Sequence, residues 1–256
     1  MGASLQAENI YRKFTDDCGS EIVALDGFNI EVQSGEIVGI VGMSGCGKST
    51  FLRLVAGLDE PQSGTLLLDG SNITGTNPRC GFIFQNATLF DWLTIEENIA
   101  FGLKARKKFK QNRAIVADMI KMVGLCGFEK SYPHQISGGM AARSSIARTF
   151  VLQPELVLLD EPLSALDAFT RISIQSELLK IQSDTNATYL LVTHDLEEAV
   201  FMCDRVVVMS ERPGQNIGEI KIDIPRPRDR TSEEFNEYRR EILEMFPLTA
   251  KKKLLA

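Results

Sequence analysis

The sequence of 256 residues lacks the usual features of a membrane-spanning, secreted or nucleic-acid-binding protein. No apolar run approaches the roughly 20 residues that a transmembrane helix requires. The N-terminal segment is polar, which is not typical of a signal peptide. The five cysteines are scattered singly, without metal-ligand spacing or a disulfide framework, so we expect a reducing cytosolic setting. The formal net charge of -6 argues against a general nucleic-acid surface, which is normally basic.

What is present is the pattern of a mixed α/β fold interrupted by a helical segment. Consecutive apolar residues, as in residues 36–42 and 188–195, are typical of strands covered on both faces. The pattern predicts strands at 4–14, 21–32, 36–42, 63–70, 155–162, 188–195, 204–210 and 219–224. It predicts three helices between residues 88 and 151, and further helices after the glycine-rich loop, at 196–203 and at 232–246.

The stretch VGMSGCGKST, residues 41–50, fits the phosphate-loop (Walker A) pattern between a predicted strand and a predicted helix. Glycines let the backbone wrap closely around phosphates, whose charge is met by N–H groups, the helix N-terminus and the ammonium of Lys48. The Ser49 hydroxyl is suited to bind Mg²⁺. The residues expected to contact the nucleotide here are Gly42, Ser44, Gly45, Cys46, Gly47, Lys48, Ser49 and Thr50.

A second half-site is expected where the strand ELVLLDEP ends in two carboxylates. Asp160 can hold the Mg²⁺ shell, and Glu161 can orient and polarise a water molecule. The alternative is an acidic pair that only caps a turn. A GTPase is disfavoured because no N-K-x-D segment is present, and a nucleoside kinase because no paired Asp/Arg acceptor site is evident.

Between these halves, Ser137-Gly138-Gly139 opens a predicted helix and could bind another phosphate. A single subunit would not use two phosphate-binding helix ends on one nucleotide. In a head-to-tail dimer, each nucleotide can lie between one helix end of the first subunit and the other helix end of the second. Here the chain resembles the ABC ATPases over nearly its whole length. Their LSGGQ signature reads Ile136-Ser-Gly-Gly-Met140, and further matches are the Q-loop Gln85, the D-loop Ser164–Asp167, the switch histidine His194 and the adenine-stacking aromatic Phe14.

The resemblance implies a single ABC ATPase domain over 1–256, with a catalytic core at 1–87 and 152–256 and a helical subdomain at 88–151. It implies that ATP and Mg²⁺ are bound, with Glu161, His194, Lys48 and Gln85 catalytic and Ser49, Gln85 and Asp160 around the metal. Phe14, the phosphate loop and, from the partner, Ser137, Gly138, Gly139 and Asp167 would hold ATP. A homodimer has two complete sites, and a heterodimer stays open.

The resemblance narrows to the nitrate/sulfonate/taurine branch of bacterial importers through Met140, the stretch RPG at 212–214 and the tail after residue 221. It implies membrane permease subunits, indirectly an external solute-binding protein, a peripheral place on the cytoplasmic face of the inner membrane and no C-terminal regulatory domain. Phe90 and Trp92 are candidates for the permease contact, or pack within the helical subdomain. Ala141, Ala142 and Asp91 depart from the usual pattern, which leaves the transported solute open.

Two other functions are weighed. A soluble ABC ATPase acting on DNA or ribosomes is disfavoured because only about 110 residues, without sustained heptads, separate the two half-sites. A subunit that senses ATP without hydrolysing it is disfavoured because Glu161 and His194 are both present.

Overall fold

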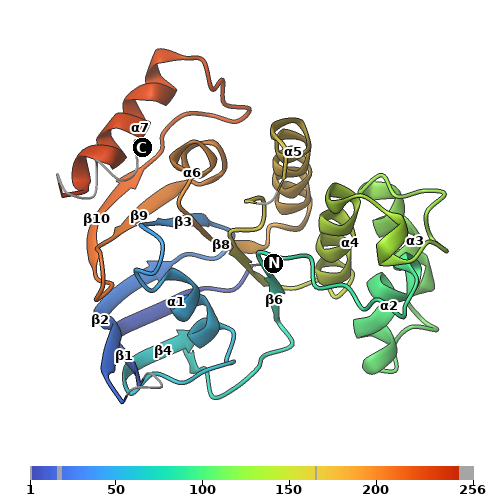
Figure 1. Cartoon of the computed structure of the whole chain (residues 1–256), viewed down its shortest axis with the longest axis horizontal. Coiled ribbons are helices and arrows are strands. Elements are labelled where there is room, and N and C mark those ends of the chain that lie inside the picture. The colour runs from blue at the N-terminus through green and yellow to red at the C-terminus, as the bar shows by residue number, and fades with distance from the viewer. Residues whose placement is uncertain (1, 16–18, 165, 248–256) are drawn as a thin grey trace. The chain divides into compact units, whose positions relative to one another are not determined.

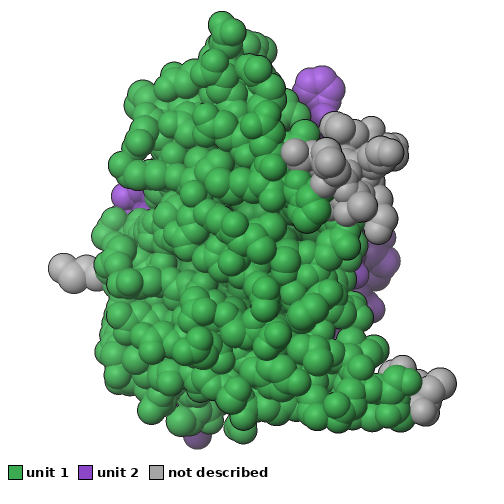
Figure 2. All heavy atoms as spheres, turned by 90° about the vertical axis from the view of Figure 1, so that its left-hand side faces the viewer, with its two compact units in different colours: residues 1–77, 185–256 green, residues 78–184 purple. Residues whose placement is uncertain are grey.

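The computed structural model describes residues 2–15, 19–164 and 166–247, which form two compact units. One unit comprises residues 1–77 and 185–256, and the other comprises residues 78–184. Figure 1 shows the elements of both, and Figure 2 shows a face formed mainly by the first unit. Each unit contains both strands and helices.

The first unit contains an antiparallel sheet with the strand order β2-β1-β4-β5. Its strands are β1 (Leu5–Thr15), β2 (Glu21–Val32), β4 (Ser63–Leu68) and β5 (Ser71–Asn72). In β2, apolar residues such as Leu25, Phe28 and Ile30 alternate with exposed positions, which is the pattern of a sheet with one covered face. The Phe28 ring lies 4.7 Å from the ring of Phe51 in helix α1 (Lys48–Val55), so α1 packs against this sheet.

A second sheet of this unit places the glycine-rich loop. The strand β3 (Ile37–Val41) lies between β8 (Thr188–Thr193) and β9 (Arg205–Met209) and is parallel to both, while β10 (Asn216–Lys221) runs antiparallel to β9. Val41 is in register with Thr193, so the chain leaves β3 and β8 at the same edge of the sheet. Two further helices belong to this unit: α6 (Leu196–Met202) and α7 (Glu233–Met245).

The second unit combines a parallel strand pair with a cluster of helices. The strand β6 (Cys80–Ile83) pairs with β7 (Leu156–Asp160), and Ile83 is in register with Leu159. Helices α2 (Ile95–Ala105), α3 (Arg113–Met122) and α4 (Gly138–Phe150) enclose a core that includes Ile99, Val116, Ile120 and Ala147. The unit also contains the 3₁₀ turn η1 (Pro133–Gln135) and the helix α5 (Ala168–Thr185).

Most predicted elements are confirmed, including the capping box of Thr94 and Glu97 at the start of α2. Asp195 caps α6 by accepting hydrogen bonds from the backbone N–H groups of Glu197 and Glu198. The sequence analysis assigns no element to β6 or α5. The predicted bounds of the helical subdomain fall inside the second unit and stay a prediction. Within the described part of the chain, no helix is both long and apolar enough to cross a membrane.

The C-terminal segment is tied to the body by a buried arginine. Arg228 is 6% exposed as a whole residue. Its guanidinium donates to the carbonyl oxygens of Val200 and Cys203, both at 2.6 Å, and to those of Ile224 and Ile222 at 2.9 and 3.1 Å. Burial lowers the pKa of this guanidinium, and the four carbonyl groups offset that cost. Arg228 therefore joins the C-terminal end of α6 to the segment that leads into α7.

We expect Arg228→Met to lower the free energy of unfolding by about 3 kcal/mol, because it leaves several buried carbonyl groups without a donor. Urea denaturation followed by circular dichroism measures this change. The matched control is Arg240→Met, which removes an exposed guanidinium from α7 and should change the stability by less than about 0.5 kcal/mol. Equal effects of the two substitutions would contradict the role given to Arg228.

Candidate functional site

The glycine-rich loop begins where β3 ends and leads into α1. Gly47 has a φ of +119°, which side chains rarely allow, and a Cβ there would lie 2.7 Å from the carbonyl oxygen of Ala24. Lys48 is only 4% exposed, and its ammonium donates to the carbonyl oxygens of Gly42 at 2.7 Å and Met43 at 3.0 Å. The loop is thus wrapped around the ammonium, as a phosphate loop requires.

His194 lies at the same edge of this sheet as the start of the loop. It follows Thr193, which is in register with Val41, whereas Gly42 follows Val41 on the neighbouring strand. The imidazole is exposed, and the next residue, Asp195, caps α6. The fold therefore holds His194 at the junction between β8 and α6, beside the strand that delivers the loop.

In the second unit, the pairing of β6 with β7 brings together Gln85 and Glu161. Their strands end in register, and the Gln85 side-chain nitrogen lies 3.5 Å from a Glu161 carboxylate oxygen and 3.3 Å from the hydroxyl oxygen of Ser164. Asp160 is the last residue of β7 and is partly buried. Three of the predicted site residues thus cluster at the carboxyl ends of two parallel strands.

The backbone of Glu161 is in a strained conformation. Its φ is +43°, in the left-handed region that non-glycine residues rarely adopt. Its carbonyl oxygen accepts hydrogen bonds from the Ser164 hydroxyl at 3.0 Å and the Ser164 N–H at 3.3 Å. Such conformations persist where the surroundings enforce them, and they concentrate at functional sites. The sharp turn after β7 thus fixes the place of the Glu161 carboxylate.

The segment Ser137–Gly139 forms the N-terminus of α4. The Ser137 hydroxyl accepts a hydrogen bond from the Met140 N–H at 3.3 Å. A Cβ on Gly139 would lie 2.8 Å from the Thr170 methyl group, so packing against α5 favours glycine there. Apart from its chain neighbours and the backbone of its own helix, no described atom lies within 4 Å of the place that a Cβ on Gly138 would take. The described packing therefore does not require glycine at position 138.

Asp167 has a structural role in addition to the one predicted. Its carboxylate accepts hydrogen bonds from the backbone N–H groups of Phe169 and Thr170, both at 3.1 Å, in the first turn of α5. Hydrogen bonds from the side chain and backbone of Thr170 lower the pKa of Asp167, so the carboxylate stays ionised. The segment before α5 is therefore held by the same residue that is expected to face a partner.

The two alanines that depart from the usual pattern line a hollow within the second unit. A cavity of about 310 Å³ is bordered by Ala141 and Ala142 of α4, by Phe84 and Gln85, and by Pro162 and Leu166. Longer side chains at 141 and 142 would occupy part of this space. The presence of alanine at positions 141 and 142 therefore changes the surroundings of Gln85 and leaves its contact with Glu161 in place.

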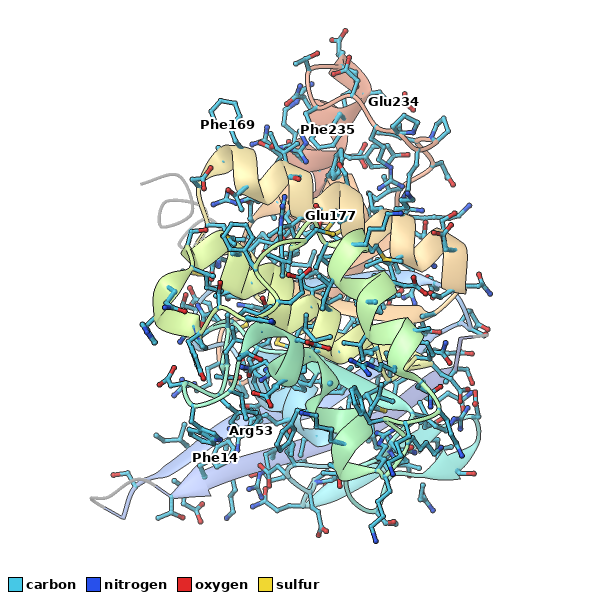
Figure 3. The ribbon with its side chains drawn as sticks, turned by 90° about the vertical axis from the view of Figure 1, so that its right-hand side faces the viewer. Phe14, Arg53, Phe169, Glu177, Glu234 and Phe235 are labelled. Carbon is cyan, nitrogen blue, oxygen red and sulfur yellow. The ribbon has the colours of Figure 1, made fainter. Side chains whose placement is uncertain are left out.

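Phe14, which is labelled in Figure 3, lies near the end of β1, and 38% of the residue is exposed. The guanidinium of Arg12 stacks over its ring at 4.6 Å from the centroid.

Three of the predicted contacts in the glycine-rich loop, Ser44, Gly45 and Cys46, line a cavity of about 340 Å³ together with Met43, Glu211 and Arg212. From the sequence, Arg212 only supports the resemblance to one branch of the family. Its contact with the loop cannot be predicted, because Arg212 and Gly45 are 167 residues apart in the chain.

Comparisons with known proteins agree with this geometry. A family model described as "ABC transporter" matches residues 25–164. The chain is 44% identical over 225 residues to the aliphatic sulfonates import ATP-binding protein of Bacillus cereus, covering 88% of this chain and 89% of that protein. It is also 44% identical over 234 residues to the bicarbonate transport ATP-binding protein of Synechococcus elongatus, covering 90% of this chain and 35% of that protein.

Among solved structures, the fold is similar to the dimeric post-hydrolysis state of an ATP-binding cassette bound to ADP and phosphate. The TM-score is 0.76 at 29% identity, and the match covers 86% of this chain and 100% of that chain. The predicted fold class, an ABC ATPase fold with a mixed β core, an antiparallel part and a helical insertion, is confirmed. The chain therefore belongs to the ABC transporter family and is one of its ATP-hydrolysing cassettes.

Proposed function

We propose that the chain is the ATP-hydrolysing subunit of an importer, in which ATP closes a dimer of cassettes that drives a membrane permease. The observation that carries the proposal is the open N-terminus of α4. Ser137 and Gly138 present a helix end of the kind that binds phosphate, and Gly138 has open space where its side chain would be. A nucleotide held by a second chain is the ligand that fits this helix end.

In this scheme, the glycine-rich loop binds the phosphates of ATP, and Phe14 stacks on the adenine. The residues that would hold Mg²⁺ are Ser49, through its hydroxyl, Asp160, through its carboxylate, and Gln85, through its side-chain oxygen. The Gln85 nitrogen faces Glu161 and Ser164, which leaves its oxygen for a metal ion. These oxygen donors suit Mg²⁺, which takes few protein ligands together with substrate phosphates and water. The bound metal would neutralise charge on the phosphates.

Hydrolysis is assigned to Glu161, Lys48 and His194. The Glu161 carboxylate accepts a proton from a water molecule as the water oxygen bonds to the γ-phosphorus, and the bond between that phosphorus and the ADP oxygen breaks. Lys48 stabilises the charge on the transferring group, and His194 positions the γ-phosphate and the water. The strained backbone of Glu161 and its contact with Gln85 support a fixed general base.

The dimer follows from the two kinds of phosphate-binding helix end in one chain. Each ATP is held by the glycine-rich loop of one chain and by Ser137, Gly138 and Gly139 of the other, with Asp167 at the interface. Hydrolysis removes the γ-phosphate that joins them, and the chains separate. A homodimer has two complete sites. The dimeric cassette found among the solved structures supports this arrangement.

The permease contact is assigned to an aromatic cluster in the helical part. Trp92 is 72% exposed, so it does not pack inside the unit, and the Phe90 ring lies 5.3 Å from it and 4.5 Å from the ring of Phe101. Exposed aromatic residues of this kind are enriched at interfaces. We assign this surface to a permease segment, which places the chain as a peripheral subunit on the cytoplasmic face of the bacterial inner membrane.

The transported solute is assigned to small anions. The two relatives are named for sulfonates and bicarbonate, which are both anionic, and their identity to this chain is the same. A nitrate-, sulfonate- or taurine-like solute, delivered by an external binding protein, fits this range. In this scheme the permease and the external binding protein, rather than the cassette, choose among these solutes.

We expect Glu161→Gln to keep ATP binding and to slow hydrolysis by about 10²- to 10⁴-fold, because it removes the general base. Excess ATP should then trap the variant as a dimer in gel filtration, and a phosphate-release assay measures the rate. The matched control is Glu155→Gln at the other end of β7, where the carboxylate pairs with Arg79 at 2.7 Å. The control should hydrolyse ATP at nearly the normal rate. A monomeric Glu161→Gln variant in excess ATP would contradict the scheme.

Mixing two inactive variants tests whether each site is shared. Lys48→Ala disables the loop and leaves the α4 end intact, whereas Gly138→Asp places a carboxylate at that end and leaves the loop intact. In a mixed dimer, one site combines both intact parts. Equal amounts of the variants should regain about a quarter of the normal rate, since half of randomly formed dimers are mixed and each has one site. The absence of any recovery, with both variants folded, would contradict independent shared sites.

A further inference from the structure

The loop between β9 and β10, residues 210–215, holds the glycine-rich loop from the side. The Arg212 guanidinium donates two hydrogen bonds to the carbonyl oxygen of Gly45, from Nε at 3.0 Å and from a terminal nitrogen at 2.9 Å. A Cβ on Gly45 would lie 3.2 Å from that terminal nitrogen, and the φ of Gly45 is +78°. Position 45 therefore favours glycine for two reasons: its backbone conformation and the close approach of Arg212.

The 210–215 loop is itself fixed in place. The Ser210 hydroxyl donates to the Pro213 carbonyl oxygen at 2.7 Å and accepts from the Gln215 N–H at 2.9 Å, which closes the loop on itself. Gly214 exchanges backbone hydrogen bonds with β2, donating to Ala24 at 2.9 Å and accepting from Asp26 at 3.3 Å. Arg212 is thus presented from a loop that is anchored to the sheet.

The close approach of position 214 to the phosphate loop requires glycine there. A Cβ at position 214 would lie 2.5 Å from the carbonyl oxygen of Cys46, which is too close for any side chain. The backbone of the 210–215 loop therefore lies against the glycine-rich loop, and the guanidinium contact is part of a wider packing interface.

Cationic side chains bind the carbonyl oxygens of the glycine-rich loop, and this orients its peptide groups. Cations bind three of its carbonyl oxygens: Lys48 takes those of Gly42 and Met43, and Arg212 takes that of Gly45. A peptide group that turned its carbonyl oxygen toward a phosphate would repel it, whereas the opposite N–H attracts it. Fixing these oxygens on cations keeps the peptide groups in the orientation that suits an anion.

Arg212 also adds charge beside the same space. Its side chain is exposed, and together with Glu211 it borders the cavity of about 340 Å³ that is otherwise lined by residues 43–46 of the glycine-rich loop. The Arg212 charge attracts a polyphosphate in the loop, the Glu211 carboxylate opposes it, and salt screens both effects.

We propose that Arg212 is a positioning residue of the phosphate site, which holds the Gly45 peptide group in the orientation that binds the polyphosphate of a nucleotide. The proposal rests on the proposed function in taking the phosphates of ATP as the ligand of the loop. Because Arg212 contacts the main chain of the loop and not the reacting atoms, we expect it to contribute to binding rather than to the chemical step.

The experiment uses the full chain with Arg212→Ala, Arg212→Lys and a control. For Arg212→Ala we expect the KM for MgATP to rise by roughly tenfold, as for the loss of a charge-assisted hydrogen bond, and kcat to stay within about twofold. Arg212→Lys keeps the charge and loses the paired donors, so its KM for MgATP should lie between those of the wild type and Arg212→Ala. The control is Lys221→Ala in the same hairpin, whose ammonium pairs with Asp223 at 2.6 Å and whose loss should leave the KM unchanged.

Equilibrium binding separates this role from general damage. ATP and ADP should bind Arg212→Ala more weakly, by the same factor as the change in KM, whereas adenosine, which has no phosphate, should bind with normal affinity. An unchanged KM in Arg212→Ala, a fall in kcat alone, or an equal loss of adenosine affinity would overturn the proposal. If Arg212→Ala does not fold, as judged by its melting curve, Arg212→Gln and Arg212→Lys provide the same comparison.

The two proposals fail in different ways. A wild-type chain that binds ATP without hydrolysing it would contradict the proposed function, and the ATP, ADP and adenosine affinities would still test Arg212. A wild-type chain that hydrolyses ATP, with Arg212→Ala binding ATP normally, would contradict the role of Arg212 alone.

Discussion

Parallel strand pairing places the groups to which we assign ATP hydrolysis: the glycine-rich loop with Lys48, His194, Gln85 and Glu161. Parallel strands end at one edge of a sheet, so residues that follow neighbouring strands are brought together whatever their separation in sequence. The register of β3 with β8 puts the glycine-rich loop beside His194, and the register of β6 with β7 puts Gln85 beside Glu161. Every residue of β3 and β8 is buried, so these two strands are part of the core of their unit. The positions of the catalytic groups therefore depend on the buried strands that carry them.

The electrostatics of the phosphate loop are local and differ from those of the whole chain. The chain has a net charge of -6, yet the loop surrounds the Lys48 ammonium and is braced by the Arg212 guanidinium. Both cations bind main-chain carbonyl oxygens, which leaves the peptide N–H groups as the natural partners of an anion. An acidic protein can therefore bind a highly charged anion, because short-range dipoles and charges decide binding and distant charges are screened.

Much of the fold and of the candidate site could be predicted from the sequence, because their signals are local. The bounds of β2 and the cap of α2 follow from alternation and from Thr94 and Glu97. The sequence pattern does not predict α5, because exposed apolar residues such as Phe169 obscure the periodicity of its buried face. The contacts of Arg212 with Gly45 and of Arg228 with α6 could not be predicted, since only the folded chain brings these residues together. The positive φ of Glu161 leaves no trace in the sequence either.

The central claim is that the cassette drives a membrane permease, and the partners of the closed dimer test it most directly. Tagged Glu161→Gln chain would be purified with ATP from detergent-solubilised native membranes, and the proteins that accompany it identified by mass spectrometry. We predict a permease with several membrane spans, together with a solute-binding protein where it stays attached. Loss of the permease on Trp92→Ala would connect it to the aromatic cluster around Trp92. Recovery of soluble partners alone would contradict the claim and would favour an ABC ATPase with no role in transport.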